Sequence, residues 1–243
     1  MKYIQWISHR GLCQNCDENS QASFQSAVDE GFNWLETDLR VTSDHKIVLT
    51  HDPDFNKIAG VDKKVSDLTL AQVKALVLRQ GGGILELNEF SEQFSSQNWV
   101  FDIKPESGVE CIGLLEDFFS TFDDPMFYQE RIIFLFWDKN HQRIFENSFP
   151  GATCFAREYE CIRAGVSILA RLPILGGIKK GKIYSLVPSL LGIPLYTKRI
   201  IDEYHKKGAK VLAYLPENSV DIESAYDCGF DYILSNNPPQ NRN

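Results

Sequence analysis

Side chains that could carry out acid–base and metal chemistry are concentrated in the first 51 residues of this 243-residue chain. His9 ends one apolar run, Glu36 and Asp38 lie two residues apart in a second, and His51 follows a third. Imidazoles can accept and donate protons near neutral pH, and carboxylate oxygens are ligands for hard divalent cations. These residue types together favour metal-assisted cleavage of a phosphodiester.

A fourth apolar run ends on Asp102 and Lys104, again two residues apart. Side chains two apart along a strand share a face, so each pair presents both members to the same surface. We expect Glu36, Asp38 and Asp102 to supply oxygen ligands to Mg²⁺ or Ca²⁺, because zinc would recruit histidine or thiolate. Arg10 and Lys104 would hold phosphate oxygens, the guanidinium through a fork and the ammonium as a point charge.

The composition is that of an ordinary globular protein, with 43% hydrophobic residues and a net charge of −8. This charge argues against broad nucleic-acid binding but permits a phosphate substrate beside a bound cation. No apolar run reaches the roughly 20 residues of a membrane span, and residues 1–8 are too short for a signal peptide. We therefore expect a cytoplasmic protein with reduced cysteines, in which Cys13 and Cys16 are loop residues rather than a redox or zinc pair.

Strand-like and helix-like segments alternate along the whole chain. Strands are expected at 3–8, 33–40, 46–50, 98–103, 131–136, 152–155, 182–186, 210–214 and 231–235. Helices are expected at 20–30, 69–77, 108–121, 139–147, 158–170, 197–207 and 219–228. Only five residues join the strands 33–40 and 46–50, which is too few for a parallel crossover, so these two form an antiparallel hairpin.

The eight strands that remain predict a (β/α)8 TIM barrel, with the hairpin as an arm and a loop and helix insertion at 51–97. We expect one domain that spans residues 1–243. An open doubly wound sheet is the alternative, but the Gly-rich phosphate turn usual after its first strand is absent. The apolar segment 165–194 is expected either to pack on the barrel or to form a rim that contacts a lipid chain or membrane surface.

Four short motifs follow one another in the first 52 residues. They are His9-Arg10-Gly11, Glu18-Asn19-Ser20, Glu36-Thr37-Asp38 and His51-Asp52. In order and spacing they resemble the glycerophosphodiester phosphodiesterase family, whose usual pattern is His-Arg-Gly, Glu-Asn-Thr, Glu-x-Asp and His-Asp. The resemblance implies a (β/α)8 barrel that hydrolyses glycerophosphodiesters to sn-glycerol 3-phosphate and an alcohol with a divalent metal. By position it implies an acid–base pair, His9 and His51, the metal ligands Glu36, Asp38 and Asp102, and the phosphate or substrate contacts Arg10, Lys104 and Glu18.

The chain departs from this family pattern at the third metal ligand. The family usually has Glu-x-Lys where this chain has Asp102-Ile103-Lys104, a form closer to the related spider-toxin-type phospholipase D enzymes. The late Trp-Thr and Thr-Asp-x-Pro segments are replaced by 213–215 and 235–238. Two alternatives therefore stand beside glycerophosphodiester hydrolysis: phospholipase D-like cleavage of lysophospholipids on the same barrel, and a non-catalytic module that binds a phosphodiester.

Overall fold

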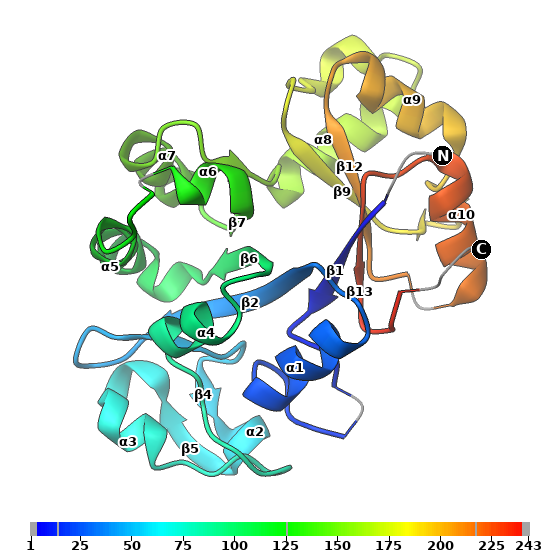
Figure 1. The fold of residues 1–243 in the computed structure, drawn as a ribbon. Helices are drawn as coiled ribbons and strands as arrows, with labels where there is room; N and C mark the ends of the chain where they lie inside the picture. The colour runs from blue at the N-terminus through cyan, green and yellow to red at the C-terminus, as the bar shows by residue number, and fades with distance from the viewer. Residues whose placement is uncertain (1–3, 14, 125, 217, 240–243) are drawn as a thin grey trace. The chain divides into compact units, whose positions relative to one another are not determined.

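The structure is a computed structural model that describes residues 4–13, 15–124, 126–216 and 218–239 (Figure 1). The chain divides into two compact units. The N-terminal unit consists of Ser8–Ala152 with Pro238–Asn243, and the C-terminal unit consists of Met1–Ile7 with Thr153–Asn237. All eight residues expected to form the functional site fall in the N-terminal unit, which is described first.

Three parallel strands of the N-terminal unit pair in the order β7, β6, β2. Their bounds are Trp34–Val41 for β2, Asn98–Ile103 for β6 and Ile132–Phe136 for β7. Every residue of β2 is buried, as expected for a parallel strand covered on both faces. The strand β3 (Ile47–Leu49) pairs antiparallel with β2, which confirms the predicted hairpin. The parallel register sets Asp38 directly beside Asp102.

Helices cover this sheet and bury aromatic side chains against it. They are α1 (Gln21–Asp29), α4 (Leu87–Gln93), α5 (Gly108–Ser120), α6 (Phe127–Arg131) and α7 (Lys139–Ser148). Ser20 caps α1 in a capping box with Ser23, because each side chain accepts a hydrogen bond from the backbone of the other. The Phe24 ring of α1 lies 4.9 Å from the Phe90 ring of α4, so the start of α1 is fixed against the core.

The segment 51–97 forms a small addition to the unit rather than a plain loop. It contains β4 (Asp54–Phe55), α2 (Asn56–Ala59), β5 (Val61–Lys64), the 3₁₀ turn Val65–Asp67 and α3 (Leu70–Lys74), followed by α4. The strands β4 and β5 pair antiparallel. A separate apolar cluster holds these pieces together: Val48, Phe55, Ile58, Val65, Val73, Leu78 and Ile84. The insertion expected from the sequence is therefore confirmed, with more secondary structure than expected.

The C-terminal unit contributes three parallel strands, which pair in the order β9, β12, β13. The bounds are Ile183–Leu186 for β9, Lys210–Tyr214 for β12 and Tyr232–Ser235 for β13. Its helices are α8 (Glu158–Leu169), α9 (Lys198–Lys206) and α10 (Ser219–Cys228), with a 3₁₀ turn η3 (Pro173–Gly176) and a hairpin of β10 (Ser189–Leu190) and β11 (Ile193–Pro194). The short strand β8 spans Thr153–Cys154, and β1 spans Gln5–His9.

All nine predicted strands and all seven predicted helices occur, each within a few residues of its expected bounds. The elements that the sequence did not predict are short: α2, α4 and α6, with the two-residue strands β4, β10 and β11 and the four-residue strand β5. Such short pieces give no periodicity to detect. Among the described residues, no helix has the length and apolar character that crossing a membrane requires.

Candidate active site

Three buried carboxylates lie together where β2 and β6 run side by side. Glu36 and Asp38 come from β2, and Asp102 comes from β6. Each offers one oxygen, and the three oxygens lie within 4.8 Å of one another. Because Asp38 and Asp102 are register partners on parallel strands, the sheet itself sets their spacing. The clustering predicted from the sequence is therefore present.

Two cationic side chains neutralise part of this charge. The Nζ atom of Lys104 lies 2.6 Å from Asp38 Oδ1 and 2.6 Å from Asp102 Oδ2. The guanidinium Nε of Arg10 lies 3.2 Å from Asp38 Oδ2, and the Arg10 backbone N–H donates to Glu36 Oε2 at 3.0 Å. Arg10 Nη1 also lies 3.3 Å from both carboxylate oxygens of Glu18. Six of the eight predicted site residues are thus joined by direct contacts.

The carboxylates differ in how readily they ionise. Burial, followed by repulsion from Asp38 and Asp102, raises the pKa of Glu36 well above its ordinary value of 4.5. Burial also raises the pKa of Asp102. Burial acts in the same direction on Asp38, but the charges of Lys104 and Arg10 outweigh it and lower the Asp38 pKa. The nearby positive charge therefore favours ionisation of Asp38, while Glu36 and Asp102 hold a proton more tightly than free carboxyl groups do.

This donor set fits a hard divalent cation. The cluster consists of carboxylate oxygens alone, the ligands that Mg²⁺ and Ca²⁺ prefer. The raised pKa of Glu36 shows that its carboxylate form has too little positive charge nearby. A divalent cation beside Glu36 would supply that charge. Glu36, Asp38 and Asp102 are therefore the residues that could hold a metal ion.

Both histidines lie at or just after the end of a strand. His9 is the last residue of β1, and His51 comes two residues after β3. The His51 carbonyl oxygen accepts hydrogen bonds from Arg40 Nε at 2.9 Å and Arg40 Nη2 at 2.7 Å, and Arg40 belongs to β2. The Nδ1 atom of His51 lies 2.8 Å from Asp52 Oδ1, which orients its ring. His51 is therefore tied through Arg40 to the strand that carries Glu36 and Asp38.

The structure adds three residues that the sequence did not identify as part of the site. Asn19 Nδ2 donates to Asp38 Oδ2 at 2.8 Å, and Trp137 Nε1 donates to Asp102 Oδ1 at 2.7 Å. Arg40, the third, holds the His51 backbone. Asn19 lies inside one of the four motifs, and Trp137 directly follows β7. The motif and the strand end are therefore the sequence signals that could have identified them. Trp137 is 54% exposed, which leaves much of its indole open to solvent beside the carboxylates.

A strained turn after β1 connects this cluster to α1. Arg10 and Gly11 both have positive φ, at 57° and 81°. A Cβ on Gly11 would lie 2.4 Å from Ser23 Oγ and 2.6 Å from the Ser23 backbone carbon, so only glycine fits this position. The Arg10 carbonyl oxygen accepts from the Asn19 N–H at 3.0 Å and from Ser23 Oγ at 3.1 Å. The His-Arg-Gly and Glu-Asn-Ser motifs therefore fold against each other.

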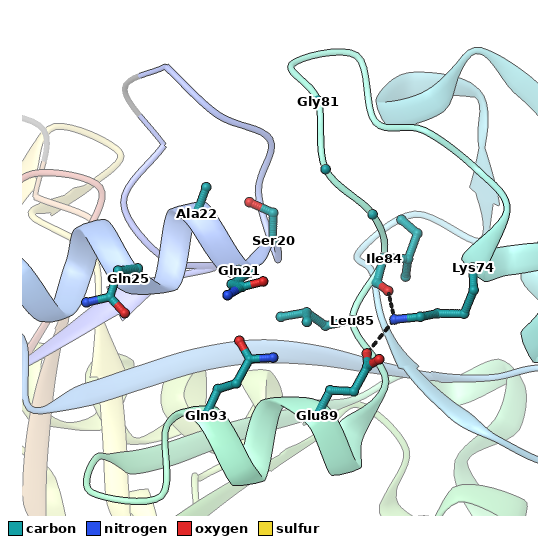
Figure 2. Close-up of a pocket in the computed structure, with 12 residues that line it drawn as sticks. Ser20, Gln21, Ala22, Gln25, Lys74, Gly81, Ile84, Leu85, Glu89 and Gln93 are labelled. Carbon is teal, nitrogen blue, oxygen red and sulfur yellow. Dashed lines mark hydrogen bonds and ion pairs between the residues drawn. The ribbon is translucent and has the colours of Figure 1, made fainter.

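A cavity of about 470 Å³ lies elsewhere in the N-terminal unit, between the start of α1, the helix α4 and the glycines 81–83 (Figure 2). Lys74 crosses one side of it, where its Nζ pairs with Glu89 and donates to the Ile84 carbonyl oxygen at 2.9 Å. Its lining includes neither the carboxylates nor the histidines. This cavity is separate from the candidate active site.

Comparisons with known proteins agree with this geometry. The model of the glycerophosphoryl diester phosphodiesterase family matches residues 9–132, just over half of the chain. The chain is 23% identical over 239 residues to the glycerophosphodiester phosphodiesterase of Caldanaerobacter subterraneus, which covers 96% of this chain and 93% of that protein. It is 40% identical over 67 residues to the lysophospholipase D GDPD1 of Rattus norvegicus. This match covers 28% of this chain and 21% of that protein.

Among solved structures, the chain resembles an Oleispira antarctica phosphodiesterase in complex with the product sn-glycerol-3-phosphate. The sequence identity is 20% and the TM-score is 0.75, over 96% of this chain and 93% of that one. A likeness over nearly the whole chain shows a shared fold. The (β/α)8 barrel expected from the sequence is thereby confirmed.

Proposed function

Since this chain belongs to the glycerophosphoryl diester phosphodiesterase family, we propose that it hydrolyses glycerophosphodiesters to sn-glycerol 3-phosphate and an alcohol, as one domain of residues 1–243. One observation carries the proposal. A buried cluster of Glu36, Asp38 and Asp102, flanked by Arg10 and Lys104, lies inside the matched segment. The product bound to the Oleispira antarctica protein is of the kind that we propose here.

Glu36, Asp38 and Asp102 would hold a Mg²⁺ or Ca²⁺ ion. Such an ion, when bound, supplies Lewis-acid stabilisation of the negative charge that develops on the phosphate oxygens. Lys104 and Arg10 would add fixed positive charge on the same group. Burial of Lys104 lowers its pKa, but the neighbouring charges of Asp38 and Asp102 outweigh this and raise it, so the ammonium stays charged throughout the neutral range.

His9 and His51 would move the protons. One imidazole takes the proton from the attacking oxygen as the new phosphorus–oxygen bond forms. The other donates a proton to the alkoxide that leaves as the old bond breaks, so the total charge is unchanged. One histidine must start neutral and the other protonated, and turnover should therefore fall at both acidic and alkaline pH. The contact of His51 Nδ1 with the Asp52 carboxylate supports this role, because it leaves Nε2 as the ring nitrogen for proton transfer.

The test is phosphorus NMR of the purified protein with glycerophosphocholine and Mg²⁺ or Ca²⁺. We expect glycerol 3-phosphate to appear, to be abolished by EDTA, and to fall at least ~10²-fold in His9→Ala and His51→Ala. His141→Ala is the matched control, because this imidazole lies on α7 outside the carboxylate cluster. Normal turnover in His51→Ala, or in EDTA, would contradict the mechanism. Binding of the diester without product would instead support the non-catalytic module.

A second candidate substrate is a lysophospholipid. It is favoured by the 40% identity to a lysophospholipase D over 67 residues, and by Asp102 where the family usually has glutamate. Offering lysophosphatidylcholine and glycerophosphocholine together separates the two. Lysophosphatidate or a cyclic phosphate as the main product would favour the lysophospholipid. Glycerol 3-phosphate alone would remove this candidate.

A further inference from the structure

The charge of this acidic chain is distributed unevenly. Residues 161–201 contain no aspartate or glutamate, although the net charge of the whole chain is −8. The same segment carries seven cationic side chains: Arg163, Arg171, Lys179, Lys180, Lys182, Lys198 and Arg199. It lies entirely in the C-terminal unit, which holds none of the proposed catalytic residues. The segment therefore forms a basic region on a protein that is otherwise strongly acidic.

Large apolar side chains are exposed next to these cations. Tyr159, Ile162 and Val166 lie on one stripe of α8 at helical spacing and are each at least half exposed. The opposite side of α8 is buried through Ala164 and Ile168. Three more exposed apolar residues, Leu172, Ile174 and Leu175, lie in and before η3, and Ile174 is 79% exposed. We refer to these six exposed residues as the apolar surface.

The turn η3 is held rigidly against α8. A Cβ on Gly176 would lie 2.4 Å from Ser167 Oγ and 3.2 Å from the Ala164 Cα, so the backbone of η3 approaches α8 closely. The Leu172 N–H donates to the Ser167 carbonyl oxygen at 2.8 Å. Ile174 and Leu175 are therefore presented to solvent by an ordered backbone. Exposing them without a partner costs free energy that burial would recover.

Arg163 joins the two halves of the apolar surface. Its guanidinium lies 5.9 Å from the centre of the Tyr159 ring, and its Nε donates to the Gly176 carbonyl oxygen at 3.0 Å. Arg171, Lys179 and Lys180 are exposed on the chain that leads into and out of η3. Lys182 differs, because it is largely buried 3.5 Å from Glu160. Arg163 thus lies between the two groups of apolar residues, and Arg171, Lys179 and Lys180 lie at their border.

We propose that the apolar surface docks on an anionic lipid bilayer. The aliphatic side chains would enter the interfacial region, while Arg163, Arg171 and Lys179 would contact lipid phosphates. A second copy of the chain is a poorer occupant, because a symmetric interface would bring Arg163, Arg171 and Lys179 onto their own copies. Glu158, the exposed carboxylate next to Tyr159, offsets only one of these charges. Within 165–194, the residues that would contact lipid are Val166, Leu172, Ile174 and Leu175. The lipid-contacting surface also extends back along α8 to Tyr159. It does not depend on the proposed activity.

Vesicle flotation tests the proposal, using the full chain and two lipid mixtures. One is pure phosphatidylcholine, and the other contains added phosphatidylglycerol. We expect binding to the anionic vesicles only, weakened by salt. The double variant Ile174→Ser, Leu175→Ser should lower the partition coefficient at least about tenfold. The charge variant Arg171→Gln, Lys179→Gln should lower it about fivefold for each cation removed.

Val220→Ser is the matched control, because Val220 is an exposed valine on α10 of the same unit, outside the apolar surface. It should bind as the unmodified protein does. Equal binding to both kinds of vesicle, or no loss in the double variant, would overturn the proposal. A dimer that forms without lipid and disappears in the double variant would also overturn it, in favour of a second copy as occupant. Circular dichroism checks that the variants, whose changed residues are exposed, remain folded.

Discussion

Trp137 Nε1 donates a 2.7 Å hydrogen bond to Asp102 Oδ1, while the other oxygen of this carboxylate lies 2.6 Å from Lys104 Nζ. The two contacts fix the orientation of the Asp102 side chain from both sides. Aspartate is one methylene shorter than the glutamate usual at this position of the family, so its place depends more on such neighbours. Trp137 is a positioning residue for a proposed metal ligand.

Trp137→Phe should weaken metal binding, because it removes the indole donor and keeps an aromatic ring. We expect Mg²⁺ or Ca²⁺ affinity to fall about 10- to 100-fold in isothermal titration calorimetry, the usual range for such outer partners. Trp6→Phe is the control, since it removes a Trp6–Tyr226 hydrogen bond in the other unit. Unchanged affinity in Trp137→Phe would show that Lys104 alone is enough to orient Asp102.

Arg40→Lys should reduce turnover through His51. The guanidinium uses two nitrogens on the His51 carbonyl oxygen, and a lysine ammonium cannot reproduce this fork. We expect kcat to fall about tenfold with KM little changed, because a misplaced proton carrier affects the reaction more than binding. Glu106→Gln is the control, because the exposed Glu106 pairs with Arg40 Nη1, which does not contact the His51 carbonyl oxygen. Equal effects of the two variants would point to Arg40 as a structural residue only.

Metal binding should release protons. The raised pKa of Glu36 means that its carboxyl group keeps a proton above the ordinary range of glutamate, and a bound dication would displace it. Calorimetry in two buffers of different ionisation enthalpy, at pH values upward from the ordinary range of glutamate, should give different apparent heats of binding. The difference should shrink as the pH rises through the Glu36 pKa. Identical heats in both buffers would mean that Glu36 is already ionised.

The same shift makes the metal-free protein less stable at higher pH. A folded pKa above the unfolded value means that the folded state binds more protons between the two, so the free energy of unfolding falls as the pH rises through that window. Glu36→Gln should remove this part of the pH dependence. Thermal unfolding of both proteins in EDTA across the window measures it, and parallel curves for the two would contradict the assignment to Glu36.

Gly11→Ala should destabilise the N-terminal unit. Its Cβ would clash with the Ser23 backbone, and the φ of 81° strains any residue other than glycine. We expect a loss of at least about 2 kcal/mol in the free energy of urea unfolding. Gly113→Ala is the matched control, because this exposed helical position has open space around it and should gain about 0.5–1 kcal/mol. A Gly11→Ala protein as stable as the control would show that the turn can relax.

Most of the framework could be predicted because its signals are local. Long strands and helices such as β6 and α5 repeat their apolar residues often enough to reveal their period within one segment. The helix α6 has five residues and runs directly into β7, so it shows no such repeat. In 51–97 the strands are short, and their cluster is assembled from residues up to 36 positions apart, from Val48 to Ile84. Pairings of that kind cannot be recognised within a single window.

The sequence by itself determined which chemistry could occur and where along the chain. His9, Asp38 and Asp102 each stand in an apolar strand-like run, and the alternation of side chains along a strand puts residues two apart on one face. Only the tertiary structure decided which groups touch. The contacts of Lys104 with Asp38 and of Trp137 with Asp102 join residues 66 and 35 positions apart. Such contacts depend on strand register and on packing between elements, which the local pattern does not specify.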